Sequence, residues 1–92
     1  MSVVRVNNPL TVKVAVDGVP HDHIDVQWYI TEDINYEDGL DDGIACSERL
    51  AINADGTVSY IPTETGMYYA KVFLTYNNDV AENTTKPWSV IG

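Results

Sequence analysis

The stretch 64-ETGMYYA-70 opens the longest strand-like run of this sequence, which continues as far as residue 76. Successive side chains of a β-strand point to opposite faces of the sheet. Tyr68 and Ala70 therefore share one face, while Tyr69 lies on the other. Gly66 suits a sharp corner before the strand, because glycine tolerates backbone conformations that other residues avoid. The stretch predicts a corner followed by a strand, with Tyr68 facing the core and Tyr69 facing away from it.

The rest of the 92-residue chain alternates between apolar and polar residues in short runs. Asp55-Gly56 separates two of these runs, so it is expected to close a hairpin. The acidic segment 32–43 is expected to be a loop, followed by a short strand around residues 43–47. The pattern predicts one all-β domain over residues 1–92, with about seven short strands in a sandwich or barrel. The expected strands are 3-VVRV-6, 10-LTVKVAV-16, 26-VQWYI-30, 49-RLAI-52, 57-TVSYI-61, 67-MYYAKVFLTY-76 and 86-KPWSVI-91.

Two motifs follow one another along the chain: Trp28-Tyr29 within a strand-like run, and Glu64-x-Gly66-x-Tyr68-x-Ala70 at the corner. Two further strand-like runs lie between them. This arrangement covers roughly residues 10–91 and resembles the immunoglobulin superfamily. The resemblance implies an immunoglobulin-like β-sandwich of antiparallel strands in two sheets. It also implies that Trp28 is buried and that the Tyr68 hydroxyl bonds to backbone just upstream.

The sequence departs from that family at the disulfide. Ala70 stands where the second cysteine would be, and Val14 or Val16 stands where the first would fall. The single cysteine, Cys46, is at neither place. It is expected to be an inert small hydrophobe, because a reactive thiol favours basic surroundings and its own are acidic. Packing must replace the ~2–5 kcal/mol that a buried disulfide contributes. The resemblance thus implies a disulfide-free domain of bacterial or bacteriophage type.

The charge balance excludes several kinds of partner. Fourteen acidic and five basic residues give a formal net charge of −9, and the basic residues are scattered along the chain. Nucleic acids and anionic membranes require clustered lysine and arginine, so neither is an expected partner. The beginning of the sequence lacks the apolar core of a secretory signal peptide, and no run is long enough to span a bilayer. The chain is therefore expected to fold in a cytoplasm.

Catalytic and metal-binding patterns are weak. His21 and His23 flank Asp22 and could approach a transition metal if the segment were extended, although a polar loop is the preferred interpretation. The acidic segment offers calcium candidates, but its spacing does not match the EF-hand pattern, and a solvated acidic loop is preferred. No enzyme activity and no cofactor is expected. The calcium candidates are Glu37, Asp38, Asp41 and Asp42.

A partner surface is expected on the outward face of the strand pair that carries the two motifs. If Trp28 and Tyr68 point inward, alternation turns Gln27, Tyr29, Tyr69, Lys71 and Phe73 outward. Aromatic residues are enriched in interface cores, so an exposed aromatic patch there predicts a protein partner. The alternative is that Trp88, the acidic segment or the N-terminus covers the patch.

The expected function is a noncatalytic binding or structural module. By analogy with the family, the chain is expected to be a bacteriophage virion accessory protein, such as a capsid decoration, head-fibre or tail protein. It would be made in the host cytoplasm, dock on a capsid or tail, and contact carbohydrate or another host surface. Self-association is left open. The alternatives are a small acidic inhibitor of a host enzyme that imitates nucleic acid, and a domain of a bacterial surface adhesin. Fold by itself does not decide between these functions.

Overall fold

The computed structural model describes residues 2–31 and 43–92. The described chain consists of strands and their connections, with one short 3-10 turn, η1, at His21–His23. The strands are β1 (Ser2–Arg5), β2 (Leu10–Lys13), β3 (Ile24–Thr31), β4 (Ile44–Ala45), β5 (Leu50–Ala51), β6 (Thr57–Tyr60), β7 (Gly66–Tyr76), β8 (Asp79–Thr84) and β9 (Trp88–Ile91).

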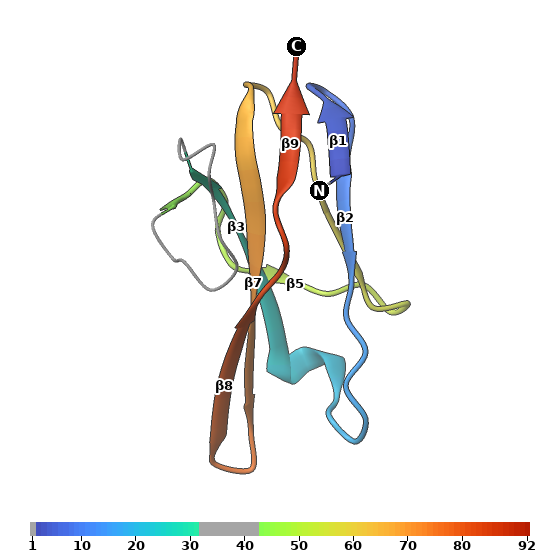
Figure 1. The fold of residues 1–92 in the computed structure, drawn as a ribbon. Coiled ribbons are helices and arrows are strands. Elements are labelled where there is room, and N and C mark those ends of the chain that lie inside the picture. The colour runs from blue at the N-terminus through green and yellow to red at the C-terminus, as the bar shows by residue number, and fades with distance from the viewer. Residues whose placement is uncertain (1, 32–42) are drawn as a thin grey trace.

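The strands form two packed sheets (Figure 1). The large sheet has the order β1-β9-β7-β3-β4, with β5 also pairing with β3 and β8 with β7, and the small sheet contains β2 and β6. The prediction of an all-β sandwich in two sheets is confirmed. Two details differ, because the described residues form nine strands and β1 runs parallel to β9.

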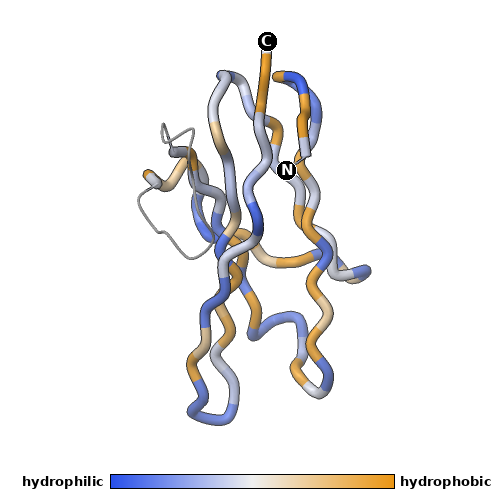
Figure 2. Tube along the Cα trace, in the orientation of Figure 1, coloured by the Kyte–Doolittle hydropathy of each residue, from blue (hydrophilic) through white to orange (hydrophobic). Residues whose placement is uncertain are grey.

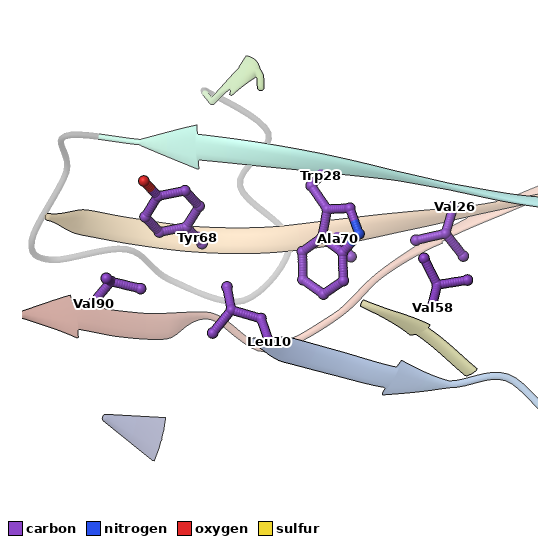
Figure 3. Close-up of a cluster of buried hydrophobic side chains, with 7 residues drawn as sticks. All are labelled: Leu10, Val26, Trp28, Val58, Tyr68, Ala70 and Val90. Carbon is purple, nitrogen blue, oxygen red and sulfur yellow. The ribbon is translucent and has the colours of Figure 1, made fainter. Parts of the chain in front are cut away.

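The core lies between the two sheets (Figure 3). Trp28 is 0% exposed and lies directly opposite Ala70, whose small side chain leaves room for the indole ring. The indole stacks against Tyr60, with centroids 5.9 Å apart, and tilts against Trp88 at 5.5 Å. Val14 is half-buried against this core cluster. Aromatic and branched side chains thus fill the space between the sheets without a disulfide.

The corner before β7 has the geometry expected from the sequence. Tyr68 is 1% exposed, and its hydroxyl donates a hydrogen bond to the Glu64 carbonyl oxygen at 2.8 Å. Gly66 has a φ of +154°, and a Cβ there would lie 3.1 Å from Cδ1 of Ile30. The Tyr68 hydroxyl thus bonds to backbone four residues upstream, and Gly66 occupies a backbone conformation that suits glycine.

The Asp55-Gly56 turn is present, but the expected hairpin is wrong. Gly56 has a φ of +85°, and its N–H donates to the Asn53 carbonyl at 2.9 Å. The strands on either side do not pair with each other, since β5 pairs with β3 and β6 pairs with β2. The turn carries the chain from one sheet to the other. Turn chemistry specifies a local reversal, whereas the partner of each strand depends on distant residues.

Strand β8 was not expected from the sequence. Asn77 and Asn78 have positive φ values of 50° and 67°, as a two-residue hairpin turn requires, and they join β7 to β8. The register of β7 shifts by one residue between β8 and β9, so Lys86 and Pro87 together lie opposite Tyr69. This β-bulge separates the two strands.

Candidate binding surface

The outward face of the large sheet holds the five residues that the sequence assigned to partner binding. The register of β3 and β7 places Gln27 opposite Lys71 and Tyr29 opposite Tyr69. Phe73 follows two residues after Lys71 on the same face. The structure therefore brings all five side chains to one face.

Tyr69 is buried, and the expectation that it is exposed is wrong. Its side chain is 0% exposed, and its ring lies parallel to that of Tyr29, with centroids 5.3 Å apart. The backbone N–H of Gly43 donates to the Tyr69 hydroxyl at 2.9 Å. A Cβ at position 43 would lie 2.8 Å from Cε1 and 2.9 Å from Cζ of Tyr69, so the backbone lies close against the hydroxyl end of the ring. Tyr69 anchors the chain that leads into β4, and Gly43 covers the hydroxyl end of its ring.

Two cations lie beside aromatic rings on the same face. The Lys71 Nζ is 5.2 Å from the ring centroid of Tyr29, and the Arg49 Cζ is 3.8 Å from that of Phe73. Lys71 is only 7% exposed, and a cation–π contact strengthens when it is desolvated. Lys71 therefore helps to hold the part of this face around Tyr29 together, whereas Arg49, beside Phe73, is exposed to solvent.

Gln27 continues the same set of contacts. Its Oε1 accepts a hydrogen bond from the Tyr29 hydroxyl at 2.9 Å, and its Nε2 donates to the Ser47 carbonyl at 3.1 Å. Both polar ends of the side chain are thus used within the protein. Gln27 orients Tyr29 and ties β3 to the segment after β4, which favours a structural role for this residue.

The accessible part of the face lies around Phe73. A hollow of about 250 Å³ is lined by Arg49, Phe73 and Val80 among others, and Val80 is 80% exposed. We refer to these three residues as the Phe73 patch. The sequence did not point to Val80, because its strand was not expected. It did not point to Arg49 either, because the position of Arg49 depends on the pairing of β5 with β3.

Two metal-binding hypotheses came from the sequence, one for the acidic segment and one for His21 and His23. The calcium candidates Glu37, Asp38, Asp41 and Asp42 lie outside the described residues. Residues 21–23 form a 3-10 turn rather than an extended segment, and the Nδ1 of His23 is hydrogen-bonded to the Thr75 carbonyl oxygen at 3.0 Å. Within residues 2–31 and 43–92, no three acidic, histidine or cysteine side chains gather in a way that could hold a metal ion.

Cys46 is half-buried against the core and interacts with the hydroxyl of Tyr60. Burial raises the pKa of the Cys46 thiol, although the Tyr60 contact partly opposes this change. Burial also raises the pKa of Tyr60 to about 12. A thiol with a raised pKa carries little thiolate at neutral pH, so this geometry agrees with the expected inert role of Cys46.

Comparison with models of known families, with characterised proteins and with solved structures gives no match. The fold and the surface are therefore interpreted from this chain alone. None of the described segments is a helix long and apolar enough to cross a membrane.

Proposed function

We propose that this protein is a noncatalytic binding module that docks on a protein partner through the Phe73 patch. One observation carries the proposal. The exposed side chain of Val80 lines the same hollow as the Phe73 ring and the Arg49 guanidinium that lies over this ring. Aromatic residues and arginine are enriched in the central contacts of protein interfaces, where they contribute most of the binding energy. An exposed apolar side chain next to such a pair adds area that a partner can bury.

The finer hypothesis is a bacteriophage virion accessory protein with an immunoglobulin-like fold. It rests on the sequence motifs and on a core that is filled without a disulfide. A protein of this kind would be made in the host cytoplasm and would then join the capsid or tail. Carbohydrate on a host surface is a second ligand that this hypothesis allows.

Charge placement distinguishes the binding module from the acidic inhibitor. An inhibitor that imitates nucleic acid needs its carboxylates in a stripe. In the described part of the chain, Glu64 precedes β7 and Asp79 follows it, so these acids lie at opposite ends of the longest strand. Asp55 lies in a connection between the sheets. These three acids do not form a stripe.

The test is affinity capture from lysates of the producing cells, with and without phage infection, followed by mass spectrometry. The double variant Arg49→Ala/Val80→Ser changes two exposed residues of the patch and should keep the fold. The matched control Arg5→Ala/Ile61→Ser removes one cation and one exposed apolar side chain elsewhere. A capsid or tail protein retained by the wild type and the control, and lost by the patch variant, is the expected result. Capture of a host nuclease or polymerase instead would favour the inhibitor hypothesis.

A further inference from the structure

The outer edge of β8 is a row of backbone groups without a strand beside it. Tyr76 and Asp79 close the two-residue turn, so they form a hydrogen-bonded pair, and such pairs alternate along an antiparallel ladder. The hydrogen bond from the Thr85 N–H to the Ala70 carbonyl at 2.9 Å fits this alternation. The N–H and C=O groups of residues 80, 82 and 84 therefore point away from β7. The Thr84 N–H donates to Oδ1 of Asn83 at 3.0 Å, so the N–H groups that this edge offers to another strand are those of Val80 and Glu82. Among the described residues, no strand pairs with that edge.

β8 and β9 follow one another along the same side of β7, on either side of the bulge. β1 pairs with the outer side of β9, whereas no described strand pairs with the outer side of β8. β1 pairs with all four residues of β9 and begins at Ser2, level with Trp88. In Figure 1, β1 lies beside β9 in the upper half, and the β7–β8 hairpin forms the lower end. The open edge of β8 is thus the continuation of the place that β1 occupies further up.

An apolar groove lies inside this open edge. Its volume is about 450 Å³, and it separates the hairpin from the segment that continues β2 downward. Figure 2 shows apolar residues recurring along that segment and along the hairpin. A second hollow of about 310 Å³ shares Val12 and Thr85 with it and extends the groove toward Ser2. The apolar residues that line the larger groove are Val12, Val14, Ala15, Val16, Val72, Leu74 and Ala81.

We propose that this groove accepts one extended segment of a partner protein, which adds as a strand to the edge of β8. Such β-strand addition draws its affinity from main-chain hydrogen bonds and its specificity from the alternate side chains that enter pockets. Every second residue of the incoming strand enters the groove and contacts apolar side chains such as Val14 and Leu74. The segment therefore carries small or branched apolar residues at alternate positions.

The acidic residues of β8 favour a partner segment that carries basic residues. The charged residues of β8 are Asp79 and Glu82, and Glu82 lies on the outward face in the middle of the open edge. Lys13 lines the facing wall of the groove, at the end of β2. Opposite charges on neighbouring strands attract, so the incoming strand has lysine or arginine beside Glu82. A second copy of this chain is disfavoured, because its own β8 would bring Asp79 and Glu82 against the same acids and each copy has a net charge of −9.

This site uses the backbone edge of β8 and the inward face of the hairpin, whereas the Phe73 patch uses outward side chains. Val80 contributes its backbone to the first and its side chain to the second. The probe is a seven-residue peptide of alternating valine and lysine with blocked ends. Amide NMR and hydrogen exchange on the full chain should show at least tenfold slower exchange at Val80 and Glu82 when the peptide is saturating. A matched peptide with glutamate in place of lysine should bind at least fivefold more weakly, and a peptide N-methylated at alternate residues should not bind.

Two variants separate this inference from the proposed function. Ala81→Glu places a charged side chain into the groove at an exposed position, and it should weaken peptide binding at least tenfold while the amide spectrum stays folded. Arg49→Ala alters the Phe73 patch without changing β8, and it should leave binding of the valine–lysine peptide within twofold. The inference is overturned if β8 gains no protection, if the N-methylated peptide binds equally well, or if β8 becomes protected at high protein concentration without peptide, which would make a second copy the occupant.

Discussion

Replacing Tyr68 by phenylalanine removes one hydroxyl and keeps the ring. The ring stays packed in the core, where its centroid is 6.0 Å from that of Tyr60. What is lost is the 2.8 Å hydrogen bond to the Glu64 carbonyl, whose donor is buried. A net hydrogen bond is worth about 0.5–1.5 kcal/mol, and leaving a buried partner unsatisfied costs about 1–3 kcal/mol. Glu64 is exposed, so water can reach its carbonyl, and we expect a loss of about 1–1.5 kcal/mol in the free energy of unfolding.

Urea unfolding followed by tryptophan fluorescence measures this loss directly. With an m value of about 1 kcal/mol/M, the midpoint should fall by about 1–1.5 M. The melting temperature should fall by about 4–8 °C per kcal/mol in a domain of this size. The control is Tyr76→Phe, because no hydrogen bond among the described residues uses the Tyr76 hydroxyl, and its loss should stay below about 0.5 kcal/mol. Equal stability of the Tyr68→Phe variant and the wild type, at unchanged m, would refute the structural role of the corner hydroxyl.

Three further predictions concern stability and reactivity. Gly56→Ala should cost at least about 1 kcal/mol more than Gly18→Ala in the same urea assay. Both glycines have similar positive φ values, but only a Cβ at position 56 would meet backbone, at 2.6 Å from the Val14 carbonyl oxygen; equal losses would contradict this reading. Stability should fall as the pH rises above about 10, because the pKa of Tyr60 is raised to about 12 in the folded state and the unfolded chain releases its proton first. Urea midpoints between pH 8 and 11 test this, and Tyr60→Phe should flatten the decline; a midpoint that does not fall would contradict it. Finally, a disulfide reagent at pH 7 should modify Cys46 at least tenfold more slowly in the native protein than in urea, because burial raises its pKa. Equal rates would show that the thiol is freely accessible.

The candidate surface divides between what the sequence predicted and what it did not. Alternation correctly predicted that Tyr29, Tyr69 and Phe73 share one face, because the period of a strand is fixed by its backbone. It could not predict that Gly43 contacts the hydroxyl end of Tyr69, since this depends on where the chain returns after β3. The accessible site therefore lies nearer Val80 than the aromatic pattern alone indicated.

The sequence by itself determined the all-β fold class, the corner before β7 and the core without a disulfide. These features depend on local chemistry: alternation, a glycine before the corner, and Ala70 opposite Trp28. The tertiary structure decided which strands pair, so that the Asp55-Gly56 turn joins two sheets rather than two paired strands. It also decided that Tyr69 is buried and that no strand of residues 2–31 and 43–92 pairs with the outer edge of β8. Pairing and covering depend on contacts between residues far apart in the chain, and these contacts leave no local pattern in the sequence.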